Sequence, residues 1–184
     1  MEWQNFSYFN VYNNVFTEEE CQRIIELQNI GHAQHSVLSN GVAKVRDSNL
    51  YWLYNSDSEQ WIFERLRCYV DMWNANYNYE IEAGCSTLQL TSYGPGQEYD
   101  LHTDIGSAQA SRRKISIVVQ LNQPTNYQGG GLSFLYGSDV LVTPDLRAGD
   151  AVVFHSWMQH KAHQVIEGSR WSLAGWYLGN KHLC

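Results

Sequence analysis

The sequence predicts a mainly β domain with flanking helices, in which a double-stranded β-helix, or jelly roll, over about residues 84–179 is supported by two helices over about residues 17–76. Two observations carry this prediction. From residue 86 onward, eight short β-rich runs are separated by Gly, Pro and Asn. Before that point, two capped segments repeat apolar residues at steps of three and four. At 184 residues, of which 43% are apolar, the chain is expected to form one domain, 1–184, with a sizeable core.

Two capping boxes mark the expected helix starts. Residues 1–16, rich in aromatic residues and Asn, are expected to form a short strand and a turn before the first helix. In Thr17-Glu-Glu-Glu20 a hydroxyl can cover a free N–H and a glutamate can reach back, which predicts a helix over about 18–29. Ser56-Asp-Ser-Glu59 repeats the pattern and predicts a second helix that runs to about Asn76.

The remaining segments are predicted as turns and strands. Between the helices, Ser39-Asn-Gly41 is an expected turn, and the segment from Val42 to Leu53 alternates well enough for a strand or an ordered loop. In a jelly roll, strands that are distant in the sequence become neighbours in space, so a site can be shared between them. The eight expected strands of the core are residues 86–93, 97–104, 114–121, 131–136, 139–143, 151–155, 161–166 and 170–178.

Composition disfavours two classes of partner. The formal net charge is −7, and the twelve Lys and Arg are scattered apart from Arg112-Arg113-Lys114, which argues against a nucleic-acid partner. No apolar run approaches the roughly 18 residues of a membrane span, and no signal peptide is evident, so we expect a cytoplasmic protein with no membrane partner. The four cysteines, at positions 21, 68, 85 and 184, show no C-x-x-C spacing and are expected to be reduced thiols.

The stretch Tyr99-Asp-Leu-His102-Thr-Asp104 is the strongest candidate for chemistry. In an extended strand, residues two apart lie on one face, so the imidazole of His102 and the carboxylate of Asp104 are expected to project together. A His and a carboxylate in this arrangement can form two corners of a 2-His-1-carboxylate site for Fe(II). The alternative is an exposed strand edge with a polar face. A third ligand must come from further along the chain, where His155, His160 and His163 compete.

Residues downstream of this strand complete a family pattern. Arg170 follows His160 by ten residues, with Gly168 two positions before it. The order H-x-D, long spacer, His and Arg resembles the signature of the Fe(II)/2-oxoglutarate dioxygenases, in the version of the prolyl 4-hydroxylase-like branch. The resemblance covers about residues 15–179, and its spacing Phe-x-Ser-x-x-x-His implies that His160 is the third metal ligand.

A cosubstrate site is predicted around Arg170. Arg170 and Ser172 lie two apart on an expected strand, so both side chains can face one carboxylate; the alternative for Arg170 is an ion pair with an internal Asp or Glu. The resemblance implies that Arg170 binds the distal carboxylate of 2-oxoglutarate and that Ser172 assists. Gln120 stands where relatives often carry a Tyr, and its contact with 2-oxoglutarate is left open. The other residues that the resemblance places near the cosubstrate are Tyr93, Ser116, Leu132 and Trp176.

Three residues are candidates for substrate contact. The resemblance places Arg46 and Trp52 in a segment over the substrate groove, and Tyr99 either against the substrate or under the ligand strand. The alternatives are a surface ion pair for Arg46, a core ring for Trp52 and an ordinary strand aromatic for Tyr99. The segment 105–112, built from small and polar residues, is expected to be a mobile loop beside the iron.

The activity that the resemblance implies is hydroxylation of an unactivated C–H bond, with release of succinate and CO2. The catalytic residues would be His102, Asp104, His160 and Arg170. The cofactors would be Fe(II), 2-oxoglutarate and O2, with ascorbate as a further candidate. By analogy of fold, the substrate is a prolyl residue in a peptide or protein. The alternatives are a free amino acid or small metabolite and, in a different class, a non-catalytic jelly-roll module that binds a partner.

Overall fold

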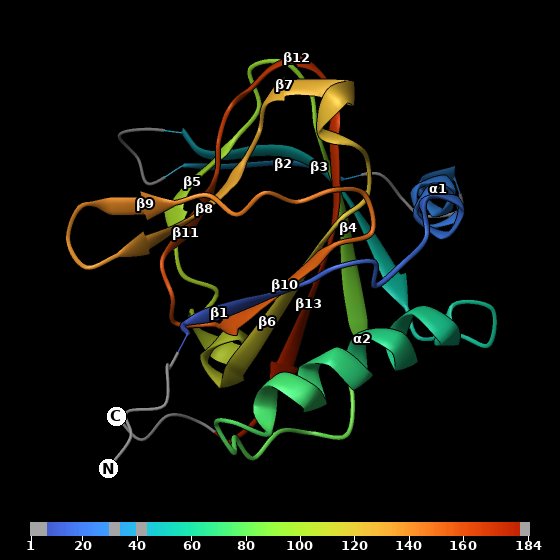
Figure 1. The fold of residues 1–184 in the computed structure, drawn as a ribbon, viewed down its shortest axis with the longest axis vertical. Coiled ribbons are helices and arrows are strands. Elements are labelled where there is room, and N and C mark those ends of the chain that lie inside the picture. Colours follow the sequence, from blue (N-terminus) through green and yellow to red (C-terminus); the bar gives the residue numbers. More distant parts are fainter. Residues whose placement is uncertain (1–6, 30–33, 40–43, 181–184) are drawn as a thin grey trace.

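The structure is a computed structural model of the chain, and it describes residues 7–29, 34–39 and 44–180. A long antiparallel sheet curls so that its two halves face each other, and two helices lie outside it (Figure 1). The predicted jelly roll with two supporting helices is therefore confirmed. Most of the predicted turn at 39–41, the first residues of the predicted segment 42–53 and the terminal Cys184 lie outside the described residues.

One large sheet and one small sheet account for the described strands. Eleven strands form the large sheet in the order β1-β10-β6-β13-β4-β3-β5-β11-β8-β9, with β2 added beside β3, while β7 pairs with β12 in the small sheet. The strands are β1 (Phe9–Tyr12), β2 (Gln34–Ser39), β3 (Lys44–Tyr54), β4 (Thr87–Tyr93), β5 (Tyr99–His102), β6 (Arg113–Gln120), β7 (Tyr127–Gly129), β8 (Leu132–Tyr136), β9 (Val140–Val142), β10 (Ala151–His155), β11 (His160–Ala162), β12 (Val165–Gly168) and β13 (Arg170–Leu178). The helices and short 3-10 turns are α1 (Glu18–Glu26), η1 (Leu27–Asn29), α2 (Gln60–Asn74), η2 (Ala108–Arg112) and η3 (Pro124–Asn126).

Two predicted strands and one predicted loop differ most from the structure. The predicted strand 161–166 is two strands, β11 and β12, because the chain leaves β8 after Ala162 and then pairs with β7 in the small sheet. The predicted strand 97–104 is shorter, since β5 ends at His102. The predicted loop 105–112 includes the 3-10 turn η2. Strands β2 and β7 were not predicted.

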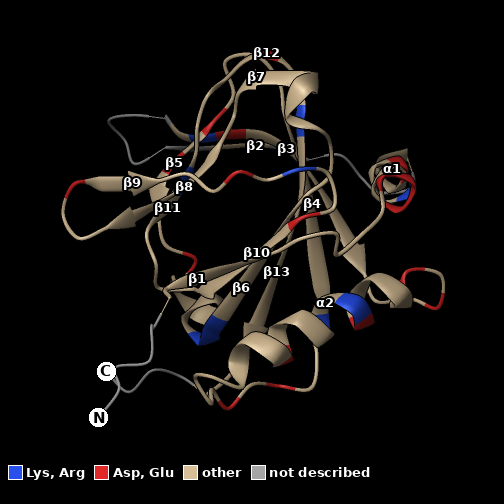
Figure 2. Ribbon diagram, viewed as in Figure 1, with Lys and Arg blue, Asp and Glu red and all other residues tan. Residues whose placement is uncertain are grey.

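Helix α1 begins at the predicted capping box. The Thr17 hydroxyl accepts a hydrogen bond from the Glu20 N–H at 3.2 Å, and the Glu20 carboxylate accepts one from the Thr17 N–H at 2.9 Å. Three acidic residues occupy the first turn, where carboxylates interact favourably with the helix N-terminus (Figure 2). The first predicted capping box is therefore confirmed.

The second predicted capping box is wrong. Helix α2 begins at Gln60, and its N-cap residue Glu59 makes no side-chain capping bond. The Ser56 hydroxyl instead contacts the Glu59 carboxylate, so it does not cover a backbone N–H. Residues 56–59 form a turn before the helix, closed by a 2.8 Å bond from the Gln60 N–H to the Ser56 carbonyl.

Strand alternation divides the residues of β6 between the core and the interior of the curled sheet. Ile115, Ile117 and Val119 belong to the main apolar cluster, which also contains the buried residues of α1 and α2. Ser116 and Gln120 are buried on the opposite face, among polar partners. The same strand therefore anchors the helices on one side and supplies polar groups to the interior on the other.

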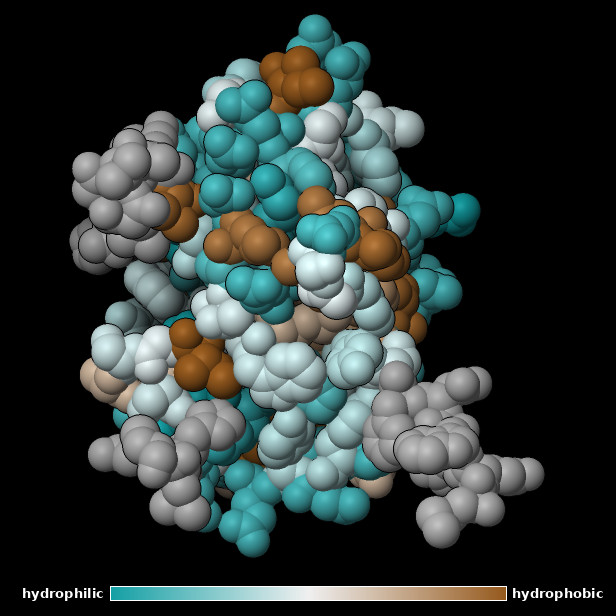
Figure 3. Space-filling model, turned by 90° about the vertical axis from the view of Figure 1, so that its left-hand side faces the viewer, coloured by the Kyte–Doolittle hydropathy of each residue, from teal (hydrophilic) through white to brown (hydrophobic). Residues whose placement is uncertain are grey.

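Strand β9 leaves apolar side chains uncovered at one edge of the sheet. Val140, Leu141 and Val142 are all exposed. In Figure 3, apolar residues gather across the middle of the face that forms the left-hand side of Figure 1. Within the described ranges, no helix is both long and apolar enough to cross a membrane. Cys21, Cys68 and Cys85 are free thiols.

Candidate metal centre and cosubstrate pocket

A pocket of about 270 Å³ lies inside the curled sheet. Its walls come from alternate residues of strands that are distant in the sequence, such as Gln89, Thr91 and Tyr93 of β4. Every candidate site residue predicted from the sequence lines it, except Ser116. The lining residues are Arg46, Leu50, Trp52, Gln89, Thr91, Tyr93, Tyr99, His102, Asp104, Arg113, Val118, Leu132, His160, Ala162, Arg170, Ser172, Ala174 and Trp176.

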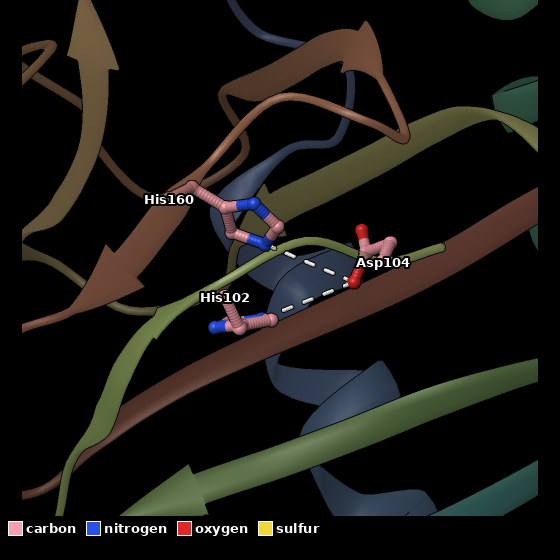
Figure 4. A group of neighbouring side chains, drawn as sticks. All are labelled: His102, Asp104 and His160. Atoms are coloured by element: carbon pink, nitrogen blue, oxygen red, sulfur yellow. Dashed lines mark ion pairs between the residues drawn. The ribbon is translucent and has the colours of Figure 1, made fainter. Parts of the chain in front are cut away.

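The three predicted metal ligands converge in this pocket (Figure 4). His102 Nε2 lies 3.9 Å from Asp104 Oδ1, and His160 Nε2 lies 3.8 Å from the same oxygen. One ligand atom from each of the three residues falls within 4.8 Å of the others. His102 and His160 are directly opposite each other on the paired strands β5 and β11. Strand pairing therefore closes the long gap in sequence between them.

Asp104 reaches the site from just beyond the end of β5. Its N–H donates to the Ser156 carbonyl at 2.9 Å, which fixes the backbone after the strand has ended. Its carboxylate accepts a 2.6 Å hydrogen bond from the Ser116 hydroxyl, which also lies 2.9 Å from the Ser156 hydroxyl. Ser116 therefore orients the Asp104 carboxylate, and the cosubstrate contact that the resemblance implies for Ser116 stays a prediction.

Both histidines present Nε2 to the pocket. His102 Nδ1 lies 2.7 Å from the Asp100 carbonyl and His160 Nδ1 lies 2.9 Å from the Met158 carbonyl. A carbonyl only accepts, so Nδ1 carries the proton in each ring and the Nε2 lone pair is left for a metal. Burial, and next the neighbouring His160, lower the pKa of His102 to about 4. The His102 imidazole is thus neutral at pH 7, as a metal ligand must be.

The electrostatics keep Asp104 ionised. Burial alone would raise the pKa of this carboxyl, but His160, the Ser116 hydrogen bond and His102 together outweigh it and hold the pKa below its ordinary value. A carboxylate and two imidazoles are the donor set that suits Fe(II) with open positions. The residues present therefore fit the metal.

The two competing histidines lie elsewhere. His163 Nε2 is 2.7 Å from the Ser133 hydroxyl, outside the metal cluster. His155 Nδ1 lies 2.8 Å from the Tyr79 hydroxyl, and the His155 ring stacks against Trp157 at a centroid distance of 4.9 Å. Neither lines the pocket. The choice of His160, which rested on the resemblance, is supported by this geometry.

Arg170 is buried in the pocket wall with part of its guanidinium unused. Its Nε donates to Gln120 Oε1 at 3.0 Å, whereas its Nη2 is buried and has no hydrogen-bond partner. The Gln120 amide is itself fixed, since its Nε2 donates to the Asn122 carbonyl at 2.9 Å. No ion pair of Arg170 occurs among the described residues, so the alternative role is not supported. An unpaired buried guanidinium nitrogen is unfavourable, and the carboxylate of a bound ligand would satisfy it.

Apart from Ser116, the other residues expected near the cosubstrate line the same pocket as Arg170. Ser172 lines the pocket on the same strand face as Arg170. The Tyr93 ring centroid lies 5.8 Å from the Arg170 guanidinium carbon, and Leu132 is a buried part of the pocket wall. Trp176 stacks under the Arg113 guanidinium at 3.9 Å. The pocket therefore offers both hydrogen-bond donors and apolar walls to a keto acid.

Arg46, Tyr99 and His102 form a stack of planar groups. The centroids of the Tyr99 and His102 rings lie 3.5 Å apart, and the two rings are nearly parallel, at an interplanar angle of 9°. The Arg46 guanidinium carbon lies 4.7 Å from the centroid of the same Tyr99 ring. Tyr99 therefore supports the His102 imidazole, which is one of the predicted metal ligands. Arg46 is buried, so it is not part of a surface ion pair, and Trp52 lines the pocket 6.4 Å from the Trp176 ring.

Sequence reasoning missed two residues of the site. Gln120 was left unassigned, although the two-residue alternation from Ser116 through Val118 places it on the same face of β6. Arg113 was considered only as part of a basic cluster, but it lines the pocket and donates to the Asp104 carbonyl at 3.2 Å. Burial lowers the pKa of Arg113. The sequence did offer a hint for Arg113, because it directly precedes the predicted strand 114–121, which carries Ser116.

A curled antiparallel sheet thus encloses a His-Asp-His cluster and a buried arginine, and this donor set is the one found at non-haem Fe(II) oxygenase sites. Residues 88–178 match the model of the 2OG-Fe(II) oxygenase superfamily. The resemblance inferred from the motifs is thus confirmed over that part of the chain. This superfamily needs Fe(II), 2-oxoglutarate and O2.

Known proteins agree on the fold and extend the likeness to hydroxylases. A PKHD-type hydroxylase of Picosynechococcus is 36% identical over 90 residues, which cover 49% of this chain but only 41% of the relative. A Pseudomonas putida prolyl-4-hydroxylase superposes with a TM-score of 0.75 over 95% of this chain and 94% of its own, at 17% identity. A Trichoplax adhaerens prolyl hydroxylase bound to a peptide fragment gives 0.73 over 95% and 84%, at 20% identity.

Proposed function

We propose that this protein is an Fe(II)- and 2-oxoglutarate-dependent hydroxylase. The observation that carries the proposal is the pairing, in one pocket, of the His102-Asp104-His160 cluster with the unsatisfied guanidinium of Arg170. When bound, Fe(II) and 2-oxoglutarate supply the oxidising chemistry, with O2 consumed and succinate and CO2 released. The protein supplies binding, orientation and the pocket inside the curled sheet.

Each residue has a defined task in this proposal. His102 and His160 bind the metal through Nε2, and the carbonyls that accept from Nδ1 hold the rings in place. Asp104 is the third ligand and is oriented by Ser116. Arg170, held by Gln120, binds the distal carboxylate of 2-oxoglutarate through Nη2. The binding energy of the cosubstrate is thereby used to position its reactive end at the metal.

For the substrate, we propose a prolyl residue of a peptide or protein. The support is the fold shared with prolyl hydroxylases, one of which is bound to a peptide, and the apolar faces of Trp52 and Trp176 in the pocket. A free amino acid or small metabolite is the alternative within the same chemistry. A module that only binds a partner would not require the Arg170 arrangement, which this pocket retains.

The test is turnover measured in two stages. Anaerobically loaded Fe(II) protein is given 2-oxoglutarate and O2, and succinate is quantified with and without a library of proline-containing peptides. Mass spectrometry then identifies any peptide that gains one oxygen atom. Matched peptides with Ala in place of Pro, and an Asp104→Ala variant, serve as controls. Absence of succinate under every condition would refute the hydroxylase, whereas succinate with oxidation of non-prolyl compounds would refute only the prolyl substrate.

A further inference from the structure

Arg46 is a second buried arginine in the pocket whose guanidinium is not fully used. Its side chain is 6% exposed and lines the same pocket as the metal cluster. Its Nε donates to the Ser48 hydroxyl at 2.8 Å, and its guanidinium lies over the Tyr99 ring at 4.7 Å. Its Nη2, like that of Arg170, is buried without a hydrogen-bond partner. These contacts hold the guanidinium in one orientation and leave one donor for a ligand.

The side chains that line the pocket carry a net positive charge, and bound cofactors would not neutralise it. Three guanidinium groups, those of Arg46, Arg113 and Arg170, line the pocket together with one carboxylate, that of Asp104. Loading adds Fe(II) with two positive charges and 2-oxoglutarate with two negative charges, which cancel. The loaded pocket therefore keeps an excess of positive charge, and burying it without a counter-ion is unfavourable.

The position of Arg46 separates its ligand from 2-oxoglutarate. Arg170 is held by Gln120 on the β13 and β6 side of the pocket, whereas Arg46 comes from β3 and stacks on Tyr99 of β5. Tyr99 in turn stacks on the metal ligand His102. A group bound by Arg46 therefore lies in the same pocket as the metal cluster, next to the Tyr99 ring that stacks on His102.

We propose that Arg46 binds a carboxylate carried by the primary substrate, at or next to the residue that is oxidised. This inference rests on the proposed function. A backbone carbonyl can accept one hydrogen bond from Nη2, but it leaves the excess charge uncorrected; a carboxylate satisfies both the donor and the charge. The substrate class is thus an anionic one, such as an amino acid or a peptide that ends in the modified residue, in contrast to an internal residue flanked by neutral groups.

The test compares acids with their amides in a binding assay. The protein is loaded with Zn(II) and 2-oxoglutarate, which permits binding without turnover. Affinities for N-acetyl-L-proline, N-acetyl-L-prolinamide and matched acid and amide pairs of other N-acetyl amino acids are measured by ligand-observed NMR. The wild-type protein is expected to prefer at least one acid over its amide by about tenfold or more, the scale of one charge-assisted hydrogen bond. No acid preference in any pair would overturn the proposal.

Variants then assign the preference to Arg46. Arg46→Gln should abolish the acid preference and leave the 2-oxoglutarate affinity unchanged, while Ser48→Ala, which frees Nε, should reduce the preference. The exposed Arg147 provides the matched control, Arg147→Gln, which should behave as wild type. Melting temperatures check that each variant is folded. If Arg46→Gln does not fold, Arg46→Lys takes its place, because it keeps the positive charge and loses the planar guanidinium.

The outcomes also separate this inference from the proposed function. If Arg46→Gln weakened 2-oxoglutarate instead of the acids, Arg46 would be a cosubstrate residue and the inference would be wrong. If the loaded protein failed to bind 2-oxoglutarate at all, the proposed function would fail. The acid and amide pairs would then be measured on the metal-free protein, where a preference lost in Arg46→Gln would still support a carboxylate site.

Discussion

Replacing Arg170 by Lys tests the cosubstrate site most directly. Lys keeps the positive charge but has a single nitrogen, so it cannot donate to Gln120 Oε1 and to a carboxylate in the way that Nε and Nη2 of Arg170 can. Loss of a hydrogen bond to a buried charged group costs about 1.5–3 kcal/mol, or about a tenfold to hundredfold rise in the dissociation constant. We therefore expect 2-oxoglutarate to bind Arg170→Lys about tenfold to hundredfold more weakly, with iron affinity nearly unchanged.

The assay follows the metal-to-ligand charge-transfer absorption while 2-oxoglutarate is titrated into the anaerobic Fe(II) protein. A Gln120→Leu variant provides an intermediate case, because it removes only the acceptor that fixes Nε and leaves Nη2 to bind the carboxylate, so it should weaken 2-oxoglutarate binding less than Arg170→Lys does. Arg147→Gln again serves as the surface control. Equal 2-oxoglutarate affinity in Arg170→Lys and wild type would remove Arg170 from the cosubstrate site and refute the reasoning.

Three further predictions concern the metal ligands and a buried histidine. His160→Ala should abolish Fe(II) binding measured by metal analysis, whereas His163→Ala should retain most of it, because the His163 ring contacts Ser133 outside the cluster; the reverse result would show that the ligand assignment is wrong. Ser116→Ala should lower iron affinity by about tenfold to hundredfold in a chelator competition, since it frees one Asp104 oxygen, and an unchanged affinity would speak against this positioning role. Burial lowers the pKa of His155 to about 4, below the unfolded value near 6.5, so the unfolded state binds more protons between these values and stability should fall as the pH drops through that window. The urea unfolding midpoint should therefore fall less between pH 7 and pH 4.5 in a His155→Gln variant than in wild type. An equal fall in both proteins would contradict this prediction.

Local sequence patterns were sufficient for several features. The capping box at Thr17 and Glu20 is read from adjacent residues, because its hydrogen bonds span three residues. The shared strand face of Arg170 and Ser172 follows from two-residue alternation, and both side chains line the pocket. The second capping box failed because a hydroxyl and a carboxylate close together in a turn can bind each other, and the pattern does not exclude that.

The sequence by itself determined the types of side chain at the site and their spacing: an H-x-D triplet, then His160, then Arg170 ten residues later. The family spacing pointed to His160, but only the tertiary structure brings its side chain to the cluster, because His160 lies opposite His102 through the pairing of β11 with β5. The tertiary structure also decided that Gln120 meets Arg170, across β6 and β13. The physical reason is that the propensities of a strand act over a few residues, whereas its neighbours in a curled sheet are set by the burial of the whole core.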